Sequence, residues 1–356
     1  MPVESNKGRG ATRNATPTRF NLKERVVDGE WLDQVEALDG VAPRRTTVTI
    51  EHPRTILTRN TSPDIGFDRS INAYRGCEHG CIYCFARPTH AFHDLSPGVD
   101  FESRLFVKST AAQLLHSTLA RPGYECKPIA MGTNTDPYQP IEEQWKITRS
   151  LIELLVETRH PFTITTKSDR VLRDLDLLKQ AADLRLASVA ISVTSLDPSI
   201  ARTLEPRAAR PAKRLAAVKA LNDAGVPCFV AIAPVIPQIT DHELEQIVEA
   251  AVAAGAPGGF YLPVRLPNEV APLFRAWLDE HFPDRARKVM AVIQSLRGGR
   301  DNDPNFFTRM RGQGAWADLL HTRFEMASKK YGLRQAKFGL RTDLFEPPAG
   351  SQMRLL

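Results

Sequence analysis

An α/β fold with a parallel sheet is predicted by two features of the sequence. From about residue 68, short apolar runs alternate with amphipathic stretches, and polar residues directly follow several of the runs. Such alternation is typical of parallel strands joined by crossover helices. The run SVAISV at 188–193 is typical of a strand buried on both faces. The expected strands are Ser70–Tyr74, Pro128–Gly132, Phe162–Thr166, Ser188–Val193, Cys228–Ala233 and Gly259–Val264, and the expected helices span about 109–120, 141–158, 171–185, 211–224, 241–254 and 269–281.

Helix ends agree with this assignment. Pro140 stands where the helix at 141–158 should begin, and Glu142 and Glu143 follow it. Proline is favoured in a first helical turn, and carboxylates there suit the positive end of the helix dipole. Gly225 follows the helix at 211–224 and is a typical C-terminal stop.

The flanking regions differ from this core. Residues 1–17 are polar and without periodicity, so we expect a disordered tail. Residues 18–65 read as an N-terminal extension with β-like stretches at Thr46–Ile50 and Thr55–Leu57. The α/β core is expected over 66–281. Residues 282–356 read as a basic helical C-terminal region, with helices at Ala286–Leu296 and Trp316–Tyr331.

Composition and charge limit the possible classes of protein. The chain has 356 residues, is 42% hydrophobic and 25% charged, and carries a net charge of +6. It lacks an apolar run long enough to span a bilayer and an N-terminal signal-peptide pattern, so a cytoplasmic location without membrane contact is expected.

Most of the positive charge lies in the last fifth of the chain. That region could bind nucleic acid or could simply be a solvated helical face. Its Lys and Arg show no aromatic interleaving.

Three cysteines carry the strongest chemical signal. Cys77, Cys81 and Cys84 lie in RGCEHGCIYCF at 75–85. They offer three thiolate ligands on one loop and leave a metal site one ligand short. An open position of this kind can hold a substrate or a cofactor, so the trio favours a catalytic metal centre.

Other uses of the trio stay open at this point. The chain has five cysteines, an odd number, and three lie within eight residues, which is unlike a disulfide framework. A zinc site would need His79, His90 or His93 as fourth ligand. A zinc-stabilised nucleic-acid-binding protein is therefore one alternative, and a non-catalytic iron–sulfur protein is another.

The spacing Cys-x3-Cys-x2-Cys, with Tyr83 before the last cysteine, resembles the radical S-adenosylmethionine (SAM) enzymes. That resemblance implies a partial (β/α)6 TIM-like barrel and a [4Fe–4S] cluster whose fourth iron binds SAM. It also implies reductive cleavage of SAM to a 5′-deoxyadenosyl radical, and a reductant such as flavodoxin or ferredoxin. From the residues alone, a doubly wound sheet would give the same alternation. The longer matches TDPYQP at 135–140 and TTKS at 165–168 resemble the branch related to spore photoproduct lyase.

Polar residues at the strand ends are the candidate SAM contacts, because ligands of parallel α/β folds bind at the carboxyl ends of strands. Lys167 follows a strand and offers a cation for the methionyl carboxylate. The resemblance adds Tyr83 near adenine, Thr133 and Asp136 near the amino group, and Ser192 near the ribose or carboxylate. The family's Gly-Gly-Glu is absent, and Gly132-Thr133-Asn134 stands in its place.

The substrate and the catalytic residues that act on it are unknown from the sequence, although the basic C-terminal region keeps nucleic acid as a possible substrate. LEPRA at 204–208 and RMRGQG at 309–314 resemble an uncharacterised bacterial subgroup of the same branch. Cys126 and Cys228 are the remaining thiols that could donate hydrogen. Both precede or begin expected strands, so we expect them at the end of the barrel away from the cluster.

Overall fold

The computed structural model describes residues 8–12, 14–15, 45–336 and 339–348. In this part of the chain the main sheet has eight strands in the order β11-β10-β9-β8-β7-β6-β3-β2. All neighbouring pairs are parallel except β2 with β3. The strands are β2 Leu57–Arg59, β3 Arg69–Ile71, β6 Ile129–Met131, β7 Phe162–Thr166, β8 Ala187–Ser192, β9 Cys228–Val235, β10 Gly258–Pro263 and β11 Arg334–Gln335.

The order of the parallel strands distinguishes between the two arrangements that the sequence allowed. From β3 to β10 each strand pairs with the next core strand along the chain. A doubly wound sheet reverses direction at a switch point, whereas the strands of an α/β barrel follow one another around it. The described sheet therefore has barrel-type order, and its edge strands β2 and β11 are not paired with each other.

A small second sheet carries the cysteine loop. It consists of β1 Thr47–Ile50, β5 Arg104–Val107 and β4 Tyr74–Arg75, in the order β1-β5-β4. The single strand expected over Ser70–Tyr74 is divided into β3 in the main sheet and β4 in this sheet. Asn72, at the break, turns its side chain to the loop after β6 and accepts a hydrogen bond from the Asn134 N–H at 2.9 Å. That polar contact takes the chain out of the main sheet.

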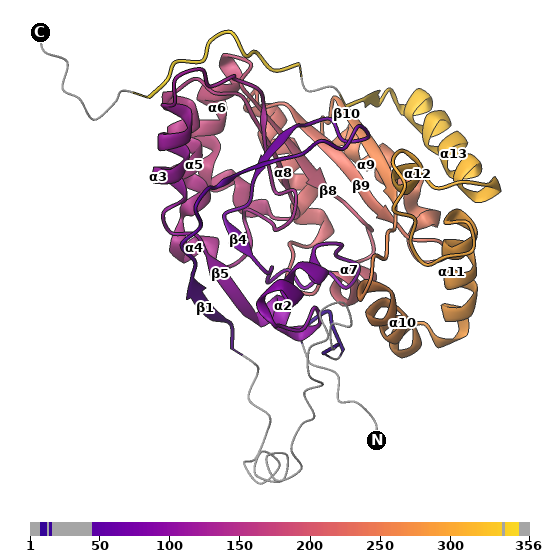
Figure 1. Cartoon of the computed structure of the whole chain (residues 1–356). Coiled ribbons are helices and arrows are strands. Elements are labelled where there is room, and N and C mark those ends of the chain that lie inside the picture. The colour runs from indigo at the N-terminus through magenta and orange to yellow at the C-terminus, as the bar shows by residue number, and fades with distance from the viewer. Residues whose placement is uncertain (1–7, 13, 16–44, 337–338, 349–356) are drawn as a thin grey trace, which may run out of the picture.

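Helices cover the outer face of the main sheet, with α3, α5 and α6 on one side and α9 and α13 on the other (Figure 1). The described helices are η2 Arg87–His93, α2 Val99–Ser103, α3 Ala111–Leu119, α4 Glu142–Trp145, α5 Ile147–Glu157, η3 Asp169–Asp174, α6 Leu175–Asp183, α7 Pro198–Leu204, α8 Pro211–Asp223, η4 Asp241–Glu243, α9 Leu244–Ala253, α10 Val270–His281, α11 Pro283–Leu296, α12 Thr308–Arg311 and α13 Ala315–Tyr331. No described helix is long and apolar enough to cross a bilayer.

The structure corrects the helix expected over 141–158. It is broken into α4 and α5 at Lys146, which has a φ of 51°. The buried carboxylate of Glu142 explains the break, because it accepts the Thr148 N–H at 3.1 Å and the Tyr74 hydroxyl. The turn at Lys146 brings the Thr148 N–H to the Glu142 carboxylate, which also binds the Tyr74 hydroxyl.

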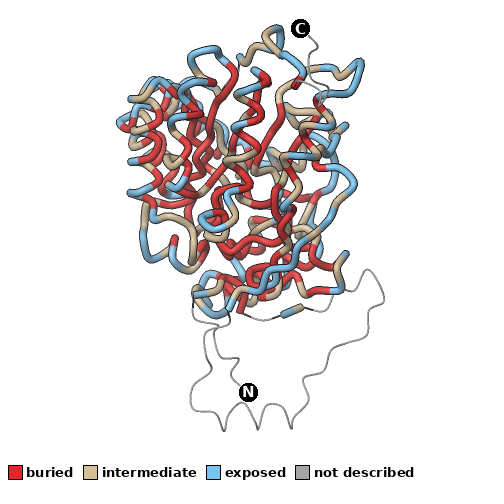
Figure 2. The backbone as a smooth tube through the Cα atoms, turned by 90° about the vertical axis from the view of Figure 1, so that its left-hand side faces the viewer, coloured by how far each residue is buried: buried red, intermediate tan, exposed pale blue. Residues whose placement is uncertain are grey.

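Among the described residues, a small apolar cluster of Cys77, Ala86 and Phe101 accompanies two extensive ones, and buried residues fill the interior of the molecule (Figure 2). The larger extensive cluster lies between the main sheet and its covering helices. The smaller extensive cluster joins the cysteine loop to α10 and α11 and includes Cys81, Ile82, Tyr83 and Ala11.

Ala11 is fully buried, and the Gly10 and Ala11 N–H groups donate to Glu102. Residues 10 and 11 of the tail expected over 1–17 are therefore packed against the rest of the chain, whereas residues 1–7, 13 and 16–17 lie outside the described residues.

Candidate iron–sulfur and SAM site

The cysteine loop leaves β4 through a tight turn at Gly76, which has a φ of +75°. A Cβ there would lie 2.5 Å from Leu105 Cδ2 and 2.8 Å from the Phe101 carbonyl oxygen. The Cys77 N–H donates to that carbonyl at 2.9 Å, and the Ile82 N–H donates to the Leu204 carbonyl at 3.0 Å. Neighbouring backbone thus fixes the loop at both ends.

A buried ion pair supports the loop from below. The Arg87 guanidinium donates to the Cys81 carbonyl at 2.9 Å and the Gly80 carbonyl at 3.1 Å, and it pairs with Glu102 at 2.5 Å. Both side chains are fully buried. Glu102 also accepts the N–H groups of Gly10 and Ala11 at 3.0 and 2.8 Å. The cysteine loop therefore rests on a charged pair whose polar atoms bind backbone from three segments.

Gln139 of the TDPYQP motif braces the other side of the loop. Its Oε1 accepts the Glu78 N–H at 2.9 Å, and its Nε2 donates to the Gly76 carbonyl at 3.2 Å. Gln139 is fully buried. The motif after β6 is thereby tied directly to the loop of the three cysteines.

The three thiols offer the donor chemistry of a cluster site. Cys77 and Cys81 are buried and Cys84 is half-buried. Burial raises the pKa of Cys81 to about 12. Burial also raises the pKa of Cys77 well above its usual range, and repulsion from Asp136, and less from Cys81 and Cys84, raises it further. A bound metal must therefore displace the protons of these thiols.

Among the described residues, no three or more Cys, His, Asp or Glu side chains are already grouped closely enough to hold a metal ion. The thiols thus share one loop without forming a preassembled ligand set. The fit to a cluster rests on three soft donors on one short loop, in a largely buried setting, with no fourth cysteine nearby in the chain.

The histidines that a zinc site would need are engaged elsewhere. His90 Nε2 lies 2.8 Å from the Arg104 carbonyl oxygen, and its ring packs edge-on against Phe101. The His93 ring lies 4.4 Å from that of Phe106. His79 Nδ1 lies 3.3 Å from Asp136 Oδ2. Within the described residues, a Cys3His group is therefore not assembled.

Asp136 connects the cysteine loop to the end of β7. Its carboxylate accepts the Thr166 hydroxyl at 2.7 Å and the Lys167 N–H at 2.7 Å, and it faces His79. Burial alone would raise the pKa of Asp136, but His79 and the hydrogen bonds hold it at about 2. This ionised carboxylate sets the conformation of the segment that carries Lys167.

Tyr83 and Lys167 lie together near a second buried charge, the carboxylate of Glu205. Lys167 Nζ lies 5.8 Å from the centre of the Tyr83 ring. The Tyr83 hydroxyl and the Arg214 guanidinium both donate to Glu205, and the Thr194 hydroxyl donates to it at 2.7 Å. Burial would lower the pKa of Lys167, but attraction to the ionised form of Cys81 and to the Glu205 carboxylate raises it overall, so the ammonium stays charged.

The two remaining rim residues make simpler contacts. Thr133 Oγ1 accepts a hydrogen bond from Asn72 Nδ2 at 3.1 Å. Ser192 ends β8 and is buried, and its carbonyl accepts from Arg214 Nη1 at 3.0 Å. The structure thus brings Tyr83, Asp136 and Lys167 together beside the cysteines, and it places Ser192 next to them through Arg214. Thr133 is linked to the group only through Asn72 and the loop after β6.

The two other cysteines lie where the sequence predicts them. Cys228 is the first residue of β9 and is fully buried, and burial raises the pKa of its thiol. Cys126 precedes β6, and burial raises its pKa to about 11. Both stand at the amino ends of parallel strands, away from the ends that carry Lys167 and Ser192.

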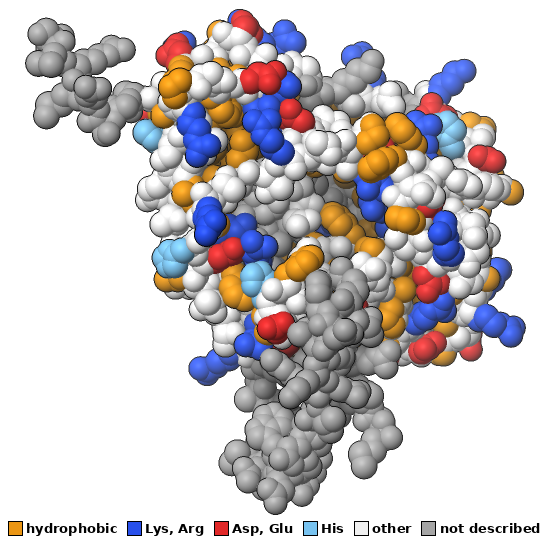
Figure 3. Space-filling model, in the orientation of Figure 1, with side chains coloured by type: hydrophobic (Ala, Val, Ile, Leu, Met, Phe, Trp, Pro, Cys, Tyr) orange, Lys and Arg blue, Asp and Glu red, His pale blue; other side chains and the backbone are white. Residues whose placement is uncertain are grey.

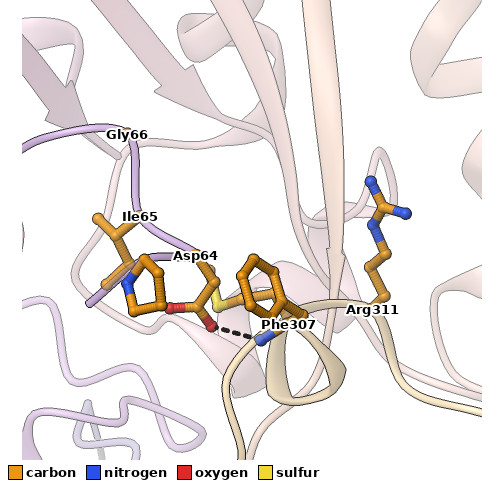
Figure 4. A pocket seen from close by; sticks show the side chains of 7 residues that line it. Asp64, Ile65, Gly66, Phe307 and Arg311 are labelled. Atoms are coloured by element: carbon orange, nitrogen blue, oxygen red, sulfur yellow. Dashed lines mark hydrogen bonds between the residues drawn. The ribbon is translucent and has the colours of Figure 1, made fainter.

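A pocket joins the N-terminal extension to the C-terminal region (Figure 4). It has a volume of about 450 Å³ and is lined by Pro63, Asp64, Ile65, Gly66, Phe307, Met310 and Arg311. Asp64 accepts the Phe307 N–H at 3.0 Å and pairs with Arg309 at 2.6 Å. Figure 3 shows one face hollowed near its centre, bordered by hydrophobic and Lys or Arg side chains.

Aromatic and arginine side chains gather on this side of the molecule. Phe306 and Phe307 are 49% and 60% exposed, and the Arg309 guanidinium lies 4.8 Å from the centre of the Phe306 ring. Arg265, which follows β10, lies 5.9 Å from the ring centre of Phe85, the residue after Cys84. The expectation that the basic region lacks aromatic interleaving is therefore wrong for Phe306–Arg311.

Sequence reasoning missed several site residues. Glu205 lies in the LEPRA run, which carried a resemblance but no assigned role. Arg87, Glu102 and Arg214 gave no signal, because a buried charge is visible only once its partner across the fold is known. The FFTRMR run at 306–311 held an aromatic and arginine pattern that could have been found.

Comparisons with known proteins agree with this geometry. The model of the Radical SAM superfamily matches residues 71–251. An uncharacterized protein of Mycobacterium tuberculosis is 39% identical over 220 residues, which is 61% of this chain and 65% of that protein. An uncharacterized protein of Methanocaldococcus jannaschii is 28% identical over 215 residues, 60% of this chain and 76% of that one. The match to the mycobacterial relative thus spans just under two thirds of its length.

Solved structures show the same fold. A spore photoproduct lyase variant superposes with a TM-score of 0.57 at 14% identity, covering 80% of this chain and 79% of that one. Another variant, solved with dinucleoside spore photoproduct, gives a TM-score of 0.56 and covers 85% and 91%. The family match runs from the last residue of β3 through β9 and includes the cysteine loop and the residues around Lys167. The chain therefore belongs to the radical SAM superfamily.

Proposed function

We propose that the chain is a radical SAM enzyme in which Cys77, Cys81 and Cys84 hold three irons of a [4Fe–4S] cluster. The observation that carries the proposal is the three-cysteine loop, braced by Gln139 and by the Arg87–Glu102 pair, at the carboxyl ends of the parallel strands. When bound, the cluster and SAM supply a one-electron cleavage that yields a 5′-deoxyadenosyl radical able to abstract hydrogen from a substrate.

The protein's own residues orient the cofactor in this proposal. Lys167, held charged beside Glu205, offers a cation for the methionyl carboxylate. The Tyr83 ring offers an apolar face near adenine, with its hydroxyl fixed on Glu205. Asp136 holds the Lys167 segment through the backbone N–H, while Thr133 and Ser192 complete the proposed rim. Tyr83 and Ser192 are buried and the other three groups are half-buried, so the access of water to the site is limited.

Replacement of a single cysteine tests the proposal. In Cys81→Ala, iron and sulfide content after anaerobic reconstitution should fall, and 5′-deoxyadenosine formation from SAM with dithionite should fall to background. Cys126→Ala is the matched control, since Cys126 is half-buried and lies at the far ends of the strands. Continued 5′-deoxyadenosine formation by Cys81→Ala would contradict the proposal. Zinc in the wild-type protein, without iron or sulfide, would support the zinc alternative instead.

For the substrate we propose a nucleic acid that binds at the aromatic and arginine cluster of Phe306, Phe307, Arg309 and Arg311, in which both rings and Arg311 are exposed and Arg309 is paired with Asp64. Exposed aromatic rings can stack on bases, and nearby arginines can bind phosphates. The fold likeness to a lyase solved with a dinucleoside photoproduct supports this class of substrate. Binding of a single-stranded oligonucleotide should weaken with added salt and in Phe307→Ala. Unchanged binding in that variant would count against this surface.

A further inference from the structure

A second cavity lies on another side of the cysteine loop. It has a volume of about 540 Å³ and is lined by His79, Pro140, Ser168, Asp169, Arg170, Arg207, Ala208, Ala209, Arg210 and Lys213. Its wall includes the cysteine loop itself, because His79 stands between Cys77 and Cys81, and the Arg207 N–H donates to the His79 carbonyl at 3.3 Å. The contact between Phe85 and Arg265 lies on a different side of the molecule from this cavity. Arg265 follows β10, whereas Ser168, which lines the cavity, follows β7, and β8 and β9 stand between these two strands.

The lining of this cavity is basic. It holds four cationic side chains and one carboxylate, drawn from the start of η3, the segment before α8 and the first turn of α8. Arg170 pairs with Glu143 and Arg207 with Glu78. Lys213 lies 3.7 Å from Asp169, and Arg210 has no side-chain partner among the described residues. Arg170, Arg210 and Lys213 are exposed.

We propose that this basic surface, formed by Arg170, Arg207, Arg210 and Lys213, is the docking site of an acidic electron-donor protein. The inference rests on the proposed cluster, which needs one electron from outside the chain. The reduced donor loses one electron at its own redox centre, and the cluster gains it. A donor seated here would lie against the backbone between Cys77 and Cys81, so the path to the cluster is short.

Charge and shape favour an acidic protein over a nucleotide. The cations are long, mostly exposed side chains, which steer an oppositely charged partner and suit a small, transient redox interface. No Phe, Tyr or Trp lines this cavity, and the one aromatic ring in its lining, His79, is only 2% exposed, so no exposed aromatic ring is offered to a base. The described aromatic and arginine cluster lies instead at 306–311.

Charge reversal provides the test. The double variant Arg210→Glu and Lys213→Glu changes two exposed side chains outside the proposed cofactor site. Arg287→Glu and Lys288→Glu on α11 is the control with the same change in net charge at another exposed place. Two quantities are measured for each protein: the Kd for flavodoxin, an acidic electron-transfer protein, by calorimetry, and the rate of cluster reduction by flavodoxin or by dithionite.

The cavity variant should bind flavodoxin and accept its electrons about 10-fold less well or worse, while the α11 variant should match wild type. Added salt should weaken flavodoxin binding to wild type, because exposed charges are screened. Reduction by dithionite should stay unchanged in all proteins. If dithionite also fails in wild type, the proposed cluster is at fault, whereas the calorimetric Kd still tests the docking surface.

Equal flavodoxin affinity in the cavity and α11 variants would overturn the proposal. A second arm measures binding of a single-stranded oligonucleotide and of inorganic pyrophosphate. If the cavity variant loses affinity for these anions but keeps its affinity for flavodoxin, the surface is a phosphate site and the docking proposal fails.

Discussion

Single residues around the cysteine loop are held by charges that lie out of contact with solvent. Arg87 and Glu102 are fully buried, and Glu205 and Arg214 are nearly so. Each pair also binds backbone, with Arg87 on the Cys81 carbonyl and Arg214 on the Ser192 carbonyl. A buried pair loses its solvation energy on folding, so it contributes to the fold only when its polar atoms are satisfied in this way. The pairs therefore fix loop geometry more than they add stability.

Removal of one partner of the buried pair is expected to be costly. Glu102→Gln leaves the buried Arg87 charge uncompensated and should lower the free energy of unfolding by about 3–5 kcal/mol. Glu143→Gln is the matched control, because the Glu143–Arg170 pair is exposed and should be worth about 0–1 kcal/mol. Urea unfolding of the apoprotein measures both. Equal losses in the two variants would show that burial of the Arg87–Glu102 pair does not matter.

At the scale of elements, close contact between neighbouring strand ends shapes the site. Gly132 directly follows β6 with a φ of +83°, and a Cβ there would lie 2.1 Å from the Thr165 carbonyl oxygen of β7. This contact brings the loop with Asp136 next to the segment with Lys167. The segment Gly132-Thr133-Asn134 departs from the family's Gly-Gly-Glu pattern, but it keeps a glycine at 132, where the backbone requires one.

A substitution at this glycine should separate the two strand ends. Gly132→Ala must move β7 backbone as well as adopt a left-handed conformation, so we expect a greater loss of stability than in Gly332→Ala. Gly332 ends α13 at a φ of 81° with nothing within 4 Å of a Cβ, so its cost should be only about 1–2 kcal/mol. Urea unfolding gives the comparison. A loss in Gly132→Ala no greater than in Gly332→Ala would mean that the contact with Thr165 relaxes freely.

At the scale of the whole molecule, an ion pair joins segments that are 245 residues apart in sequence. Arg309 donates to both oxygens of Asp64, and the Phe307 N–H adds a third donor. Arg309 and Phe307 hold the pKa of Asp64 below its usual range. The N-terminal extension and the C-terminal region therefore meet beside the exposed aromatic and arginine cluster.

Asp64→Asn should loosen this junction. The variant keeps the size of the side chain but loses the charge, so the amides of 305–311 should exchange hydrogen faster at neutral pH. Because the folded pKa of Asp64 is lowered, the contribution of the ionised group is present above pH ~4 and is lost as pH falls through the folded pKa. Asp343→Asn, in an exposed pair with Arg341, is the control. Unchanged exchange at 305–311 would show that the pair does not restrain the segment.

The sequence predicted the strands of the core well, because runs such as 188–193 are apolar on both faces and bounded by turns. It failed where a side chain far away in sequence decides the local path. Asn72 divides the expected first strand, Glu142 breaks the expected helix at Lys146, and Glu102 captures residues 10 and 11. In each case one buried or half-buried polar group competes successfully with local propensity, because its unmet hydrogen bonds would cost more.

The sequence by itself determined the chemistry of the centre, since three thiols within eight residues and a lysine after a strand are local features. Only the tertiary structure decided that the strands follow barrel-type order, that Asp136 binds the backbone of Lys167 while the Lys167 and Tyr83 side chains lie together near Glu205, and that a basic cavity borders the cysteine loop. The physical reason is that these contacts join residues separated by many tens of positions. Their energies depend on burial and distance, which no short pattern of residues specifies.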